Sequence, residues 1–572
     1  MTTKLNLLIL CLCVIFTVNS QRSKSPQNLP EFAYTFSSPY NVVDARTKKY
    51  FSKDGSILSV KFHGKKCVLQ KFDGNNNLNQ TIVNEYTDFE EGFVEEDILE
   101  VDDHFYIFYS VWNRSENKEQ LYYRELDFED CVFKSAGIKV FESTGKVVGG
   151  FGAGIGAGAN EAFGFTMTFG NIVKKFRFKV SNDKSMILAS YKEVPEKKID
   201  KINFDEIGLC IFSNTMEELY RQVIKMPVVE SKIRINDYAL DKNGDVYILA
   251  EIYHKGSKKR KFTYVFKKPK YDVELLQIKQ GNPDVFRTKI ELSNRVLTSY
   301  GLFNDTTNNE LYIAGYFANQ QWKMDRVSNG MFYCKIEDGG ISRITNSEIP
   351  LSAKNLFIKK RFQKKNTRRN NRGKQVNLTN LKPKELLFEG NSVILIGEHE
   401  YVVVTRTSGA GVGGIGGIGT TSTEYYSRNI LVTKVENSGK MIWANQIPKY
   451  QIGGEAVGGM GYKYISGPDG YYFLFLDNKK NAKLKEDKFP YKHYDKLGGY
   501  LVVYKLDDLK GEATRTTILN TRKVKGYSLN QFAISRMVET YPGQFALECY
   551  KKDKEDVLIK IQLGEPDGEE VE

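Results

Sequence analysis

A turn followed by a short apolar strand recurs along the chain. Each unit begins with Gly, Asp or Asn, which favour tight turns, and continues into a run rich in Ile, Val, Tyr and Phe, which favour strands. One example is residues 241–245 (DKNGD), followed by VYILAEIY. The recurrence predicts an all-β chain built from repeated sheets. The eight turns lie near positions 54, 102, 163, 243, 309, 391, 469 and 543.

Repeated sheets of this kind bury their faces by packing on one another, as the blades of a propeller do around a channel. We therefore expect one large β-propeller over residues 31–563, with about seven or eight irregular blades and long inserted loops. Two insertions are visible by composition, at 359–374 and at the Gly-rich 409–419. The alternative is two or three β-sandwich domains, but no linker-like segment divides the chain.

The repeating unit is clearest at residues 425–451. The strand NILVTKV is followed by the turn ENSGK and by a second strand that carries Trp443, whose large ring predicts a buried slot. Residues 434–443 (KVENSGKMIW) resemble the tryptophan-docking segment of quinoprotein-type and outer-membrane assembly propellers, in which a D-x-x-x-G-K-x-x-W stretch closes each blade. The whole chain resembles secreted bacterial propeller-type proteins of unassigned function. The resemblance implies the fold and carries no activity.

One helix is expected between the blades, at residues 214–226 (NTMEELYRQVIKM). Thr215 and a glutamate three residues later have the spacing of a capping box, and a proline follows the segment. Leu219, Val223 and Met226 would share one face of this helix.

The N-terminus predicts export. Lys4, the largely apolar run 5–18 and the small residues before Gln21 are typical of a signal peptide, with cleavage after residue 20 and a linker at 21–30. The run is shorter than the ~20 apolar residues of a membrane span, and no later stretch qualifies, so we expect no transmembrane segment. The mature protein would be periplasmic, cell-surface or extracellular. An acidic tail at 564–572 ends the chain.

Most of the formal net charge of +13 lies in one run, residues 359–374, which holds nine basic residues and no acid. Its composition predicts a disordered, solvated insertion. Two interpretations stay open: a plain solvated insertion, or contact with an acidic polysaccharide or another polyanion. The ten acids at 85–103 and the acidic tail are possible intramolecular partners. The candidate polyanion contacts are Lys359, Lys360, Arg361, Lys364, Lys365, Arg368, Arg369, Arg372 and Lys374.

No catalytic motif is present. The five His form no HExxH pair, and the chain contains no G-x-S-x-G and no G-K-[ST]. Residues 409–414 match G-x-G-x-x-G, but a strand follows where a dinucleotide site needs a helix. Beyond the signal peptide, five cysteines are scattered singly, as buried apolar residues would be. We expect neither a metal nor a cofactor.

The lack of an ordered catalytic signature predicts an exported, non-enzymatic propeller that serves as a protein- or glycan-binding or assembly platform, with a protein partner at the propeller face. The alternative is a carbohydrate-active enzyme, a glycoside hydrolase or lyase, with an acid pair that the sequence does not identify. A carboxylate pair with aromatic rings in the central funnel would favour the enzyme. A flat or filled funnel would favour the platform.

Overall fold

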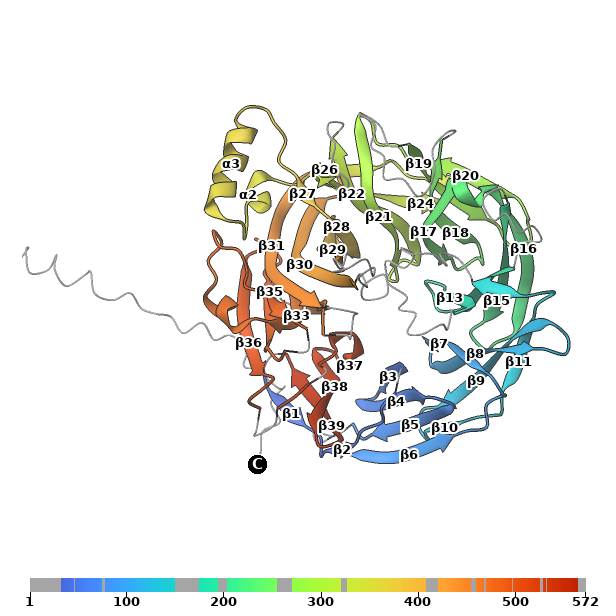
Figure 1. Cartoon of the computed structure of the whole chain (residues 1–572). Coiled ribbons are helices and arrows are strands. Elements are labelled where there is room, and N and C mark those ends of the chain that lie inside the picture. The colour runs from blue at the N-terminus through green and yellow to red at the C-terminus, as the bar shows by residue number, and fades with distance from the viewer. Residues whose placement is uncertain are drawn as a thin grey trace, which may run out of the picture.

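The computed structural model describes most of the 572-residue chain, and nearly every element in it is a β-strand. Eight sheets of four or five strands each are arranged in a ring (Figure 1), and all but one of their described strand pairs are antiparallel. The chain is an eight-bladed β-propeller. The described residues are 32–45, 47–74, 78–149, 174–193, 203–254, 270–319, 327–407, 420–453, 459–467, 470–495, 497–524, 528–530 and 532–563.

The first four blades follow the chain in order. Blade 1 comprises β3 (Thr47–Lys53), β4 (Ser56–His63), β5 (Lys66–Phe72) and β6 (Gln80–Tyr86). Blade 2 comprises β7 (Val94–Val101), β8 (His104–Asn113), β9 (Lys118–Asp127), β10 (Val132–Phe133) and β11 (Ile138–Glu142). Blade 3 comprises β12 (Val147–Gly149), β13 (Phe176–Val180), β14 (Met186–Glu193), β15 (Phe204–Ser213) and β16 (Glu218–Val229). Blade 4 comprises β17 (Ile233–Leu240), β18 (Val246–Tyr253), β19 (Tyr271–Ile278) and β20 (Val285–Lys289), and η2 (Glu230–Lys232) precedes it.

The next blades carry the insertions. Blade 5 comprises β21 (Arg295–Asp305), β22 (Glu310–Asn319), β24 (Gly330–Glu337), β25 (Gly340–Ile341) and β26 (Thr345–Glu348). Between blades 5 and 6 lie the pair β23 (Val327–Ser328) and β27 (Leu378–Thr379), and the helices α2 (Leu351–Lys354) and α3 (Lys360–Asn370). Blade 6 comprises β28 (Leu381–Glu389), β29 (Ser392–Thr407), β30 (Thr420–Glu436), β31 (Met441–Gly453) and β34 (His493–Tyr494). Blade 7 comprises β32 (Lys463–Gly467), β33 (Gly470–Asp477), β35 (Tyr500–Leu506) and β36 (Ala513–Asn520), with η3 (Lys479–Lys483) between β33 and β35.

Both ends of the propeller contribute to blade 8, which closes the ring. Its three C-terminal strands are β37 (Val538–Tyr541), β38 (Gln544–Lys552) and β39 (Glu555–Gln562), preceded by η4 (Ile534–Arg536). The N-terminal strands β1 (Tyr34–Phe36) and β2 (Tyr40–Asn41) both pair antiparallel with β39. The start of the propeller therefore completes the sheet that its end begins.

The second strands of the blades are largely buried because neighbouring blades cover both of their faces. All eight residues of β33 (GYYFLFLD) are buried, as are seven of the eight in β18 (VYILAEIY). Six of the eight turns expected from the sequence lead into such second strands, and residues 468–469 of a seventh lie outside the described residues, directly before β33. In blade 3 the second strand is β14 instead, and the expected strand at residues 161–169 lies outside the described part of the chain.

One apolar cluster fills each of the eight junctions between blades, which is the packing expected of a closed ring. Among the described residues, seven of these clusters contain between 12 and 19 buried side chains, exemplified by the junctions of blades 6 with 7 and 7 with 8. The cluster between blades 8 and 1 contains only seven, among them Tyr40, Tyr50 and Leu558. The closing junction therefore has the smallest apolar core.

The expected helix at residues 214–226 is wrong, because this segment forms the outer strand β16. Thr215 lies in the β15–β16 turn, where the Ser213 hydroxyl accepts its backbone N–H at 3.2 Å. Leu219 and Val223, which would have shared a buried helix face, are 44% and 52% exposed. Pairing with β15 imposes a period of two on a sequence whose local signals favour a helix.

The expectation of a disordered insertion at residues 359–374 is also wrong, since α3 spans most of it (Figure 1). Its Lys, Arg and Gln residues are good helix formers. Gln363 donates to the Asn355 carbonyl, and the Asn366 amide donates to the Asn355 side chain, both at 2.9 Å. These contacts hold one face of α3 against the turn that follows α2.

Trp443 occupies a slot on the neighbouring blade, as its large ring predicts. The side chain is 8% exposed, and its indole N–H donates to the Asp508 carbonyl at 2.8 Å. Gly511 lies directly against the ring, at a φ of +65°, and a Cβ there would come within 2.5 Å of it. Blade 6 is thus docked on the β35–β36 turn of blade 7.

Buried carboxylates link some blades through backbone amides. A bulge in β7 turns Glu96 toward blade 3, where one carboxylate oxygen accepts the N–H groups of Lys175 and Phe176 at 2.9 and 3.2 Å. The other oxygen accepts the Ser110 hydroxyl at 2.7 Å. Asp237 acts similarly at a bulge in β17, accepting the N–H of Leu302 on blade 5 at 2.9 Å. A bulge on an inner strand therefore aims an acid at the next blade.

Glu96→Gln is expected to stabilise the protein above neutral pH. Burial raises the pKa of Glu96 to about 7, so the folded state binds this proton more tightly than the unfolded chain does. Stability contributed by Glu96 is therefore full below about pH 4 and declines as the pH rises to about 7, by ~3 kcal/mol. A glutamine can keep the hydrogen bonds, with its oxygen on the two amides and its NH₂ on Ser110. In urea unfolding between pH 4 and 8, the free energy of unfolding of the variant should increase relative to that of the wild type as the pH rises. A difference that does not change with pH would contradict the prediction.

Candidate functional site

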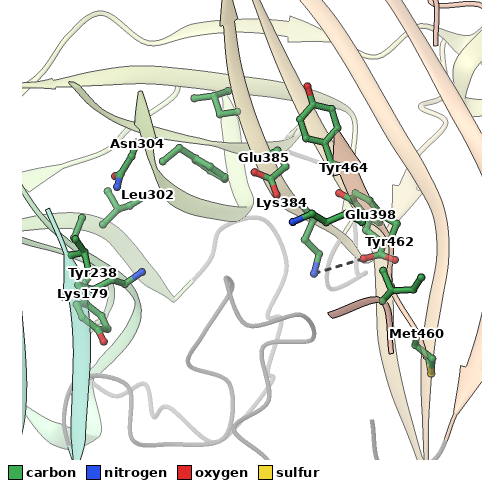
Figure 2. A pocket seen from close by; sticks show the side chains of 17 residues that line it. Lys179, Tyr238, Leu302, Asn304, Lys384, Glu385, Glu398, Met460, Tyr462 and Tyr464 are labelled. Atoms are coloured by element: carbon green, nitrogen blue, oxygen red, sulfur yellow. Dashed lines mark ion pairs between the residues drawn. The ribbon is translucent and has the colours of Figure 1, made fainter. Parts of the chain in front are cut away.

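A cavity of 420 Å³ opens at the centre of the ring, in the size range of small-molecule sites. Its walls come mainly from the inner strands of five consecutive blades, β13, β17, β21, β28 and β32, and from η4. Glu398 of β29 and residues 460–462, just before β32, complete the lining. Figure 2 shows side chains from these separate strands around one space. The lining residues with polar side chains are Lys179, Tyr238, Asn304, Lys384, Glu385, Glu398, Tyr462, Lys463 and Tyr464.

Two bulges place charged side chains of blade 6 on one side of its sheet. In β28 the register shifts between Pro383 and Glu385, which leaves Lys384 at the bulge. In β29 the register of pairing with β30 shifts between Glu398 and Glu400, which leaves His399 at the bulge. A bulge re-aims side chains in this way without breaking the sheet. Lys384 reaches both carboxylates as a result.

Lys384 and Lys449 hold this acid pair between them. The Lys384 ammonium lies 2.7 Å from Glu400 and 3.7 Å from Glu398 (Figure 2 marks the second contact). Lys449, which is fully buried on β31, forms an ion pair with Glu398, and the Ser427 hydroxyl donates to the same carboxylate oxygen. Glu398 and Glu400 are only 1% and 4% exposed. The pair is therefore engaged inside the blade.

Burial and neighbouring charges give the carboxyl groups of Glu398 and Glu400 different pKa values. Burial raises the pKa of Glu398 and lowers the pKa of its partner Lys449, because it disfavours the charged form of each group. Burial acts in the same direction on Glu400, but the ammonium groups of Lys384 and Lys382 outweigh it and lower the pKa of Glu400 to about 2. Glu400 is thus a permanent anion that is already neutralised by lysines.

The other polar side chains of the cavity wall have fewer hydrogen-bond and ion-pair partners within the protein. They include three tyrosines, Glu385 and Lys463. The Tyr462 hydroxyl is buried and hydrogen-bonded to no residue in the described part of the chain. The Glu385 side chain remains accessible, yet the surrounding protein raises the pKa of its carboxyl, an effect that Lys463 partly opposes. Tyrosine rings, an amide and paired charges of both signs suit a polar, hydroxyl-rich ligand. Tyr238 and Tyr464 complete the aromatic wall (Figure 2).

The nine predicted polyanion contacts lie elsewhere, at the outer edge of the ring. All nine are exposed, and none forms an ion pair with an acid among the described residues. Most of them are on α3, which lies next to α2 on the outside of the ring in Figure 1, whereas the acids at 85–103 belong to β6, β7 and the turns around them. No ion pair joins these two stretches among the described residues, so the intramolecular pairing left open by the sequence is not seen between them. The acidic tail at 564–572 lies outside the described residues.

Sequence reasoning missed the residues of the cavity. They come from segments between positions 179 and 534, and each occurs in a local context typical of any strand. The signal that could have found one part of them is the repetition of charges in KPKE at 382–385 and GEHE at 397–400, within otherwise apolar strands. Neither pattern indicates a central position without the fold.

The described residues contain no second cluster with the features of a metal or thiol site. Within the described ranges, no three His, Cys, Asp or Glu side chains are placed to hold a metal ion. The five cysteines beyond the N-terminal segment are all buried and unpaired, as expected. The described part of the chain contains no helix with the length and apolarity of a membrane span. The Gly-rich stretch 409–419 and the signal-peptide segment lie outside the described residues.

Comparison with known proteins gives the fold no closer assignment. No protein-family model and no curated protein matches the chain. A structure described as one of two prolyl endopeptidases is 10% identical, with a TM-score of 0.33, over 92% of this chain and 55% of its own length. A thermostable family-43 glycoside hydrolase is 10% identical (TM-score 0.25; 57% of this chain, 97% of that one). The β-propeller domain of the Trilobed protease from Pyrococcus furiosus is 8% identical (TM-score 0.24; 62% and 91%).

The chain spans about half the length of the first of these structures. At these identities and TM-scores, none of the three carries an argument about activity. Function is therefore inferred from the residues of the cavity and of the surface.

Proposed function

We propose that this protein is an exported, non-enzymatic binding propeller that takes a glycan fragment into its central cavity. The observation that carries the proposal is the engagement of Glu398 and Glu400 by Lys449 and Lys384. A glycosidase needs two carboxyl groups that face each other across the sugar. Here the buried acids come from one strand and are neutralised from within, while tyrosine rings and polar groups remain to contact a ligand.

A direct binding measurement tests the proposal. Titration of a panel of oligosaccharides into the folded chain should give saturable heat for at least one glycan class. Glu385→Gln combined with Lys463→Met should weaken that binding at least ~10-fold, because each removes a charged hydrogen-bonding group from the cavity wall. The matched control is Glu436→Gln with Lys440→Met, an exposed pair on the β30–β31 turn, which should bind as the wild type does. Equal loss in both variants, or no binding by any glycan, would contradict the proposal.

The enzyme is the second candidate, because the central cavity is neither flat nor filled and combines carboxyl groups with tyrosine rings, the arrangement that favours it. Glu385 lines the cavity together with Glu398, and its raised pKa is the property that a general acid requires. Turnover of a glycan by the wild type, abolished in Glu385→Gln, would establish the glycoside hydrolase or lyase alternative and exclude the non-enzymatic proposal.

Export belongs to the same proposal and rests on the N-terminal sequence. Sequencing the N-terminus of protein recovered outside the cytoplasm should give a start at Gln21; an intact Met1 there would contradict cleavage. A protein partner at the propeller face stays a prediction.

A further inference from the structure

The structure places a second basic segment beside the one that the sequence singles out. Residues 479–492, between β33 and β35, carry six lysines and two acids. The backbone N–H of Phe357, three residues before α3, donates to the Glu486 carbonyl in this segment at 2.8 Å. We call α3 with its flanking basic residues and the 479–492 loop together the basic edge. Its loop cations are Lys479, Lys480, Lys483, Lys485, Lys488 and Lys492, all exposed.

The basic edge holds the entire charge imbalance of the protein. The run 359–374 contributes nine positive charges and the loop a net four, which together equal the formal +13 of the whole chain. The other residues are therefore formally neutral as a set. Such concentration on two adjoining segments creates a local positive field, whereas a general excess of lysine would spread it over the surface.

The cations of α3 lie on one side of the helix. Positions 360, 361, 364, 365, 368 and 369 repeat with the i, i+1, i+4, i+5 spacing that keeps side chains within half of the circumference. The opposite side carries Gln363 and Asn366, the two residues of α3 that are only partly exposed and that bind Asn355. The outward face is thus a continuous stripe of about 14 Å, from a rise of ~1.5 Å per residue.

This stripe opposes the stability of its own helix. Lys360, Lys364 and Arg368 form one row of like charges at i, i+4 spacing, and Arg361 heads a second. Each like-charged pair costs a helix a few tenths of a kcal/mol, and α3 contains no acid to offset this. An anionic ligand along the stripe would remove the repulsion.

Internal hydrogen bonds anchor the backbone of the loop that carries these lysines. The Asn481 amide donates to Asp477 at 2.7 Å and to the Tyr491 carbonyl at 3.0 Å, and its oxygen accepts the Tyr491 N–H at 2.8 Å. On the other side, α2 is fixed to β31, since Gln446 donates to the Ala353 carbonyl at 2.7 Å. Both halves of the basic edge are therefore anchored to blades 6 and 7.

We propose that the basic edge binds a linear acidic polysaccharide along α3 and across the 479–492 loop. A stripe of cations matches a polymer whose charges repeat along its length. A lipid surface fits less well, because an interfacial helix needs an apolar face and Phe362 is the single apolar residue of α3. A single-stranded nucleic acid also fits less well, because its bases would need aromatic rings with uncovered faces on which to stack. Phe362 lies beneath the Arg361 guanidinium at 4.7 Å, and Tyr491 lies beneath the Lys480 ammonium at 5.4 Å.

The test measures binding of the whole chain to polygalacturonate and to heparin, which present carboxylate and sulfate groups respectively. We expect the affinity for at least one of them to fall ~10-fold or more between about 50 and 200 mM salt, as counterion release requires. Two variants each replace six cations by Gln, which keeps helix propensity. The α3 variant changes Lys360, Arg361, Lys364, Lys365, Arg368 and Arg369; the loop variant changes the six lysines of the loop.

A control of equal charge separates a site from general electrostatics. It replaces six exposed lysines of blades 1, 2 and 4 and of their turns by Gln: Lys49, Lys65, Lys66, Lys134, Lys139 and Lys242. The α3 and loop variants should each lose ~10-fold or more in affinity and flatten the salt dependence, while the control stays within ~2-fold. Unchanged circular dichroism would show that all three fold.

Three results would overturn the proposal. Equal losses in all variants would mean that net charge alone is responsible. An unaffected loop variant would remove the loop from the site. Tighter binding of a DNA duplex, or of vesicles containing phosphatidylserine, than of either polysaccharide would assign the basic edge to another class of ligand. The cavity variant described above should leave this binding unchanged, so the two proposals can fail separately.

Discussion

Replacing Glu548 by Gln is expected to lower the free energy of unfolding by about 3–5 kcal/mol, the usual cost of leaving a buried charge without its partner. Glu548 lies on β38 and is 2% exposed. Its carboxylate contacts the Lys48 ammonium at 2.7 Å, accepts the Tyr40 hydroxyl at 2.8 Å, and forms an ion pair with the fully buried Lys61. The substitution leaves two ammonium groups with Asp556 as their remaining acid.

The position of this cluster makes the effect large. Lys48 and Lys61 belong to blade 1 and Glu548 to blade 8, so the ion pairs cross the junction that closes the ring. That junction has the smallest apolar core of the eight among the described residues. We therefore expect loss of the cluster to open the ring between the first and last blades.

Urea unfolding at neutral pH measures the change, and Glu85→Gln is the matched control. Glu85 pairs with Lys66 at 3.2 Å in blade 1, with both side chains more than half exposed. Exposed pairs contribute about 0–1 kcal/mol, so the control should be nearly neutral. If Glu548→Gln were as mild as Glu85→Gln, the cluster would have no role in closing the ring.

The contribution of this cluster to stability should decrease at acid pH. The lysines around Glu548 hold the pKa of its carboxyl below the ordinary range despite burial, which acts in the opposite direction. Its contribution is thus complete above about pH 4 and is lost as the pH falls further. The difference in stability between the wild type and Glu548→Gln should shrink below about pH 4.

Lys449→Met is the second substitution with a large expected effect, a loss of about 3–5 kcal/mol at pH 8. Methionine fills similar volume but leaves Glu398 without its closest cation, near Glu400 and with only the more distant Lys384. Glu398 then needs a proton to remain buried. Removing the acid as well removes the unpaired buried charge, so the double variant Lys449→Met with Glu398→Gln should recover much of the lost free energy of unfolding.

The pH dependence distinguishes this mechanism from simple misfit of the new side chain. Without Lys449, the pKa of Glu398 rises further above its value of ~4.3 in an unfolded chain. A raised carboxyl pKa stabilises the fold at low pH and less as the pH increases, so the deficit of the variant should be smaller at pH 5 than at pH 8. A deficit independent of pH would contradict the prediction. Lys440→Met, in the exposed turn of the same hairpin, is the control.

Local signals were enough to predict the strands and most of the turns. Asp54, Asp102 and Asn309 take positive φ values in the turns that lead into second strands. Those strands are apolar because blades cover both faces, and the same apolarity is readable from sequence. The docked Trp443 could be predicted for the same reason, since a large ring beside a Gly-containing turn needs a slot.

The errors came from segments where neighbours override local preference. Residues 214–226 carry a capping pattern, yet the free edge of β15 pairs with them. Residues 359–374 contain no apolar core, yet Asn355 anchors Gln363 and Asn366 and keeps α3 folded. β15 directly precedes the first segment and Asn355 lies just before the second, but no local pattern shows that this strand edge and this turn are available as partners.

The sequence alone determined that the chain alternates turns with apolar strands, that these strands must stack as repeated sheets, and that nine positive charges cluster in one run. Periodicity and composition decide these properties, because they act between near neighbours. Only the tertiary structure decided the number of blades, the meeting of β1 with β39, the ring of inner strands around the cavity, and the contact of Phe357 with the 479–492 loop. These features depend on which distant segments the closed ring brings together.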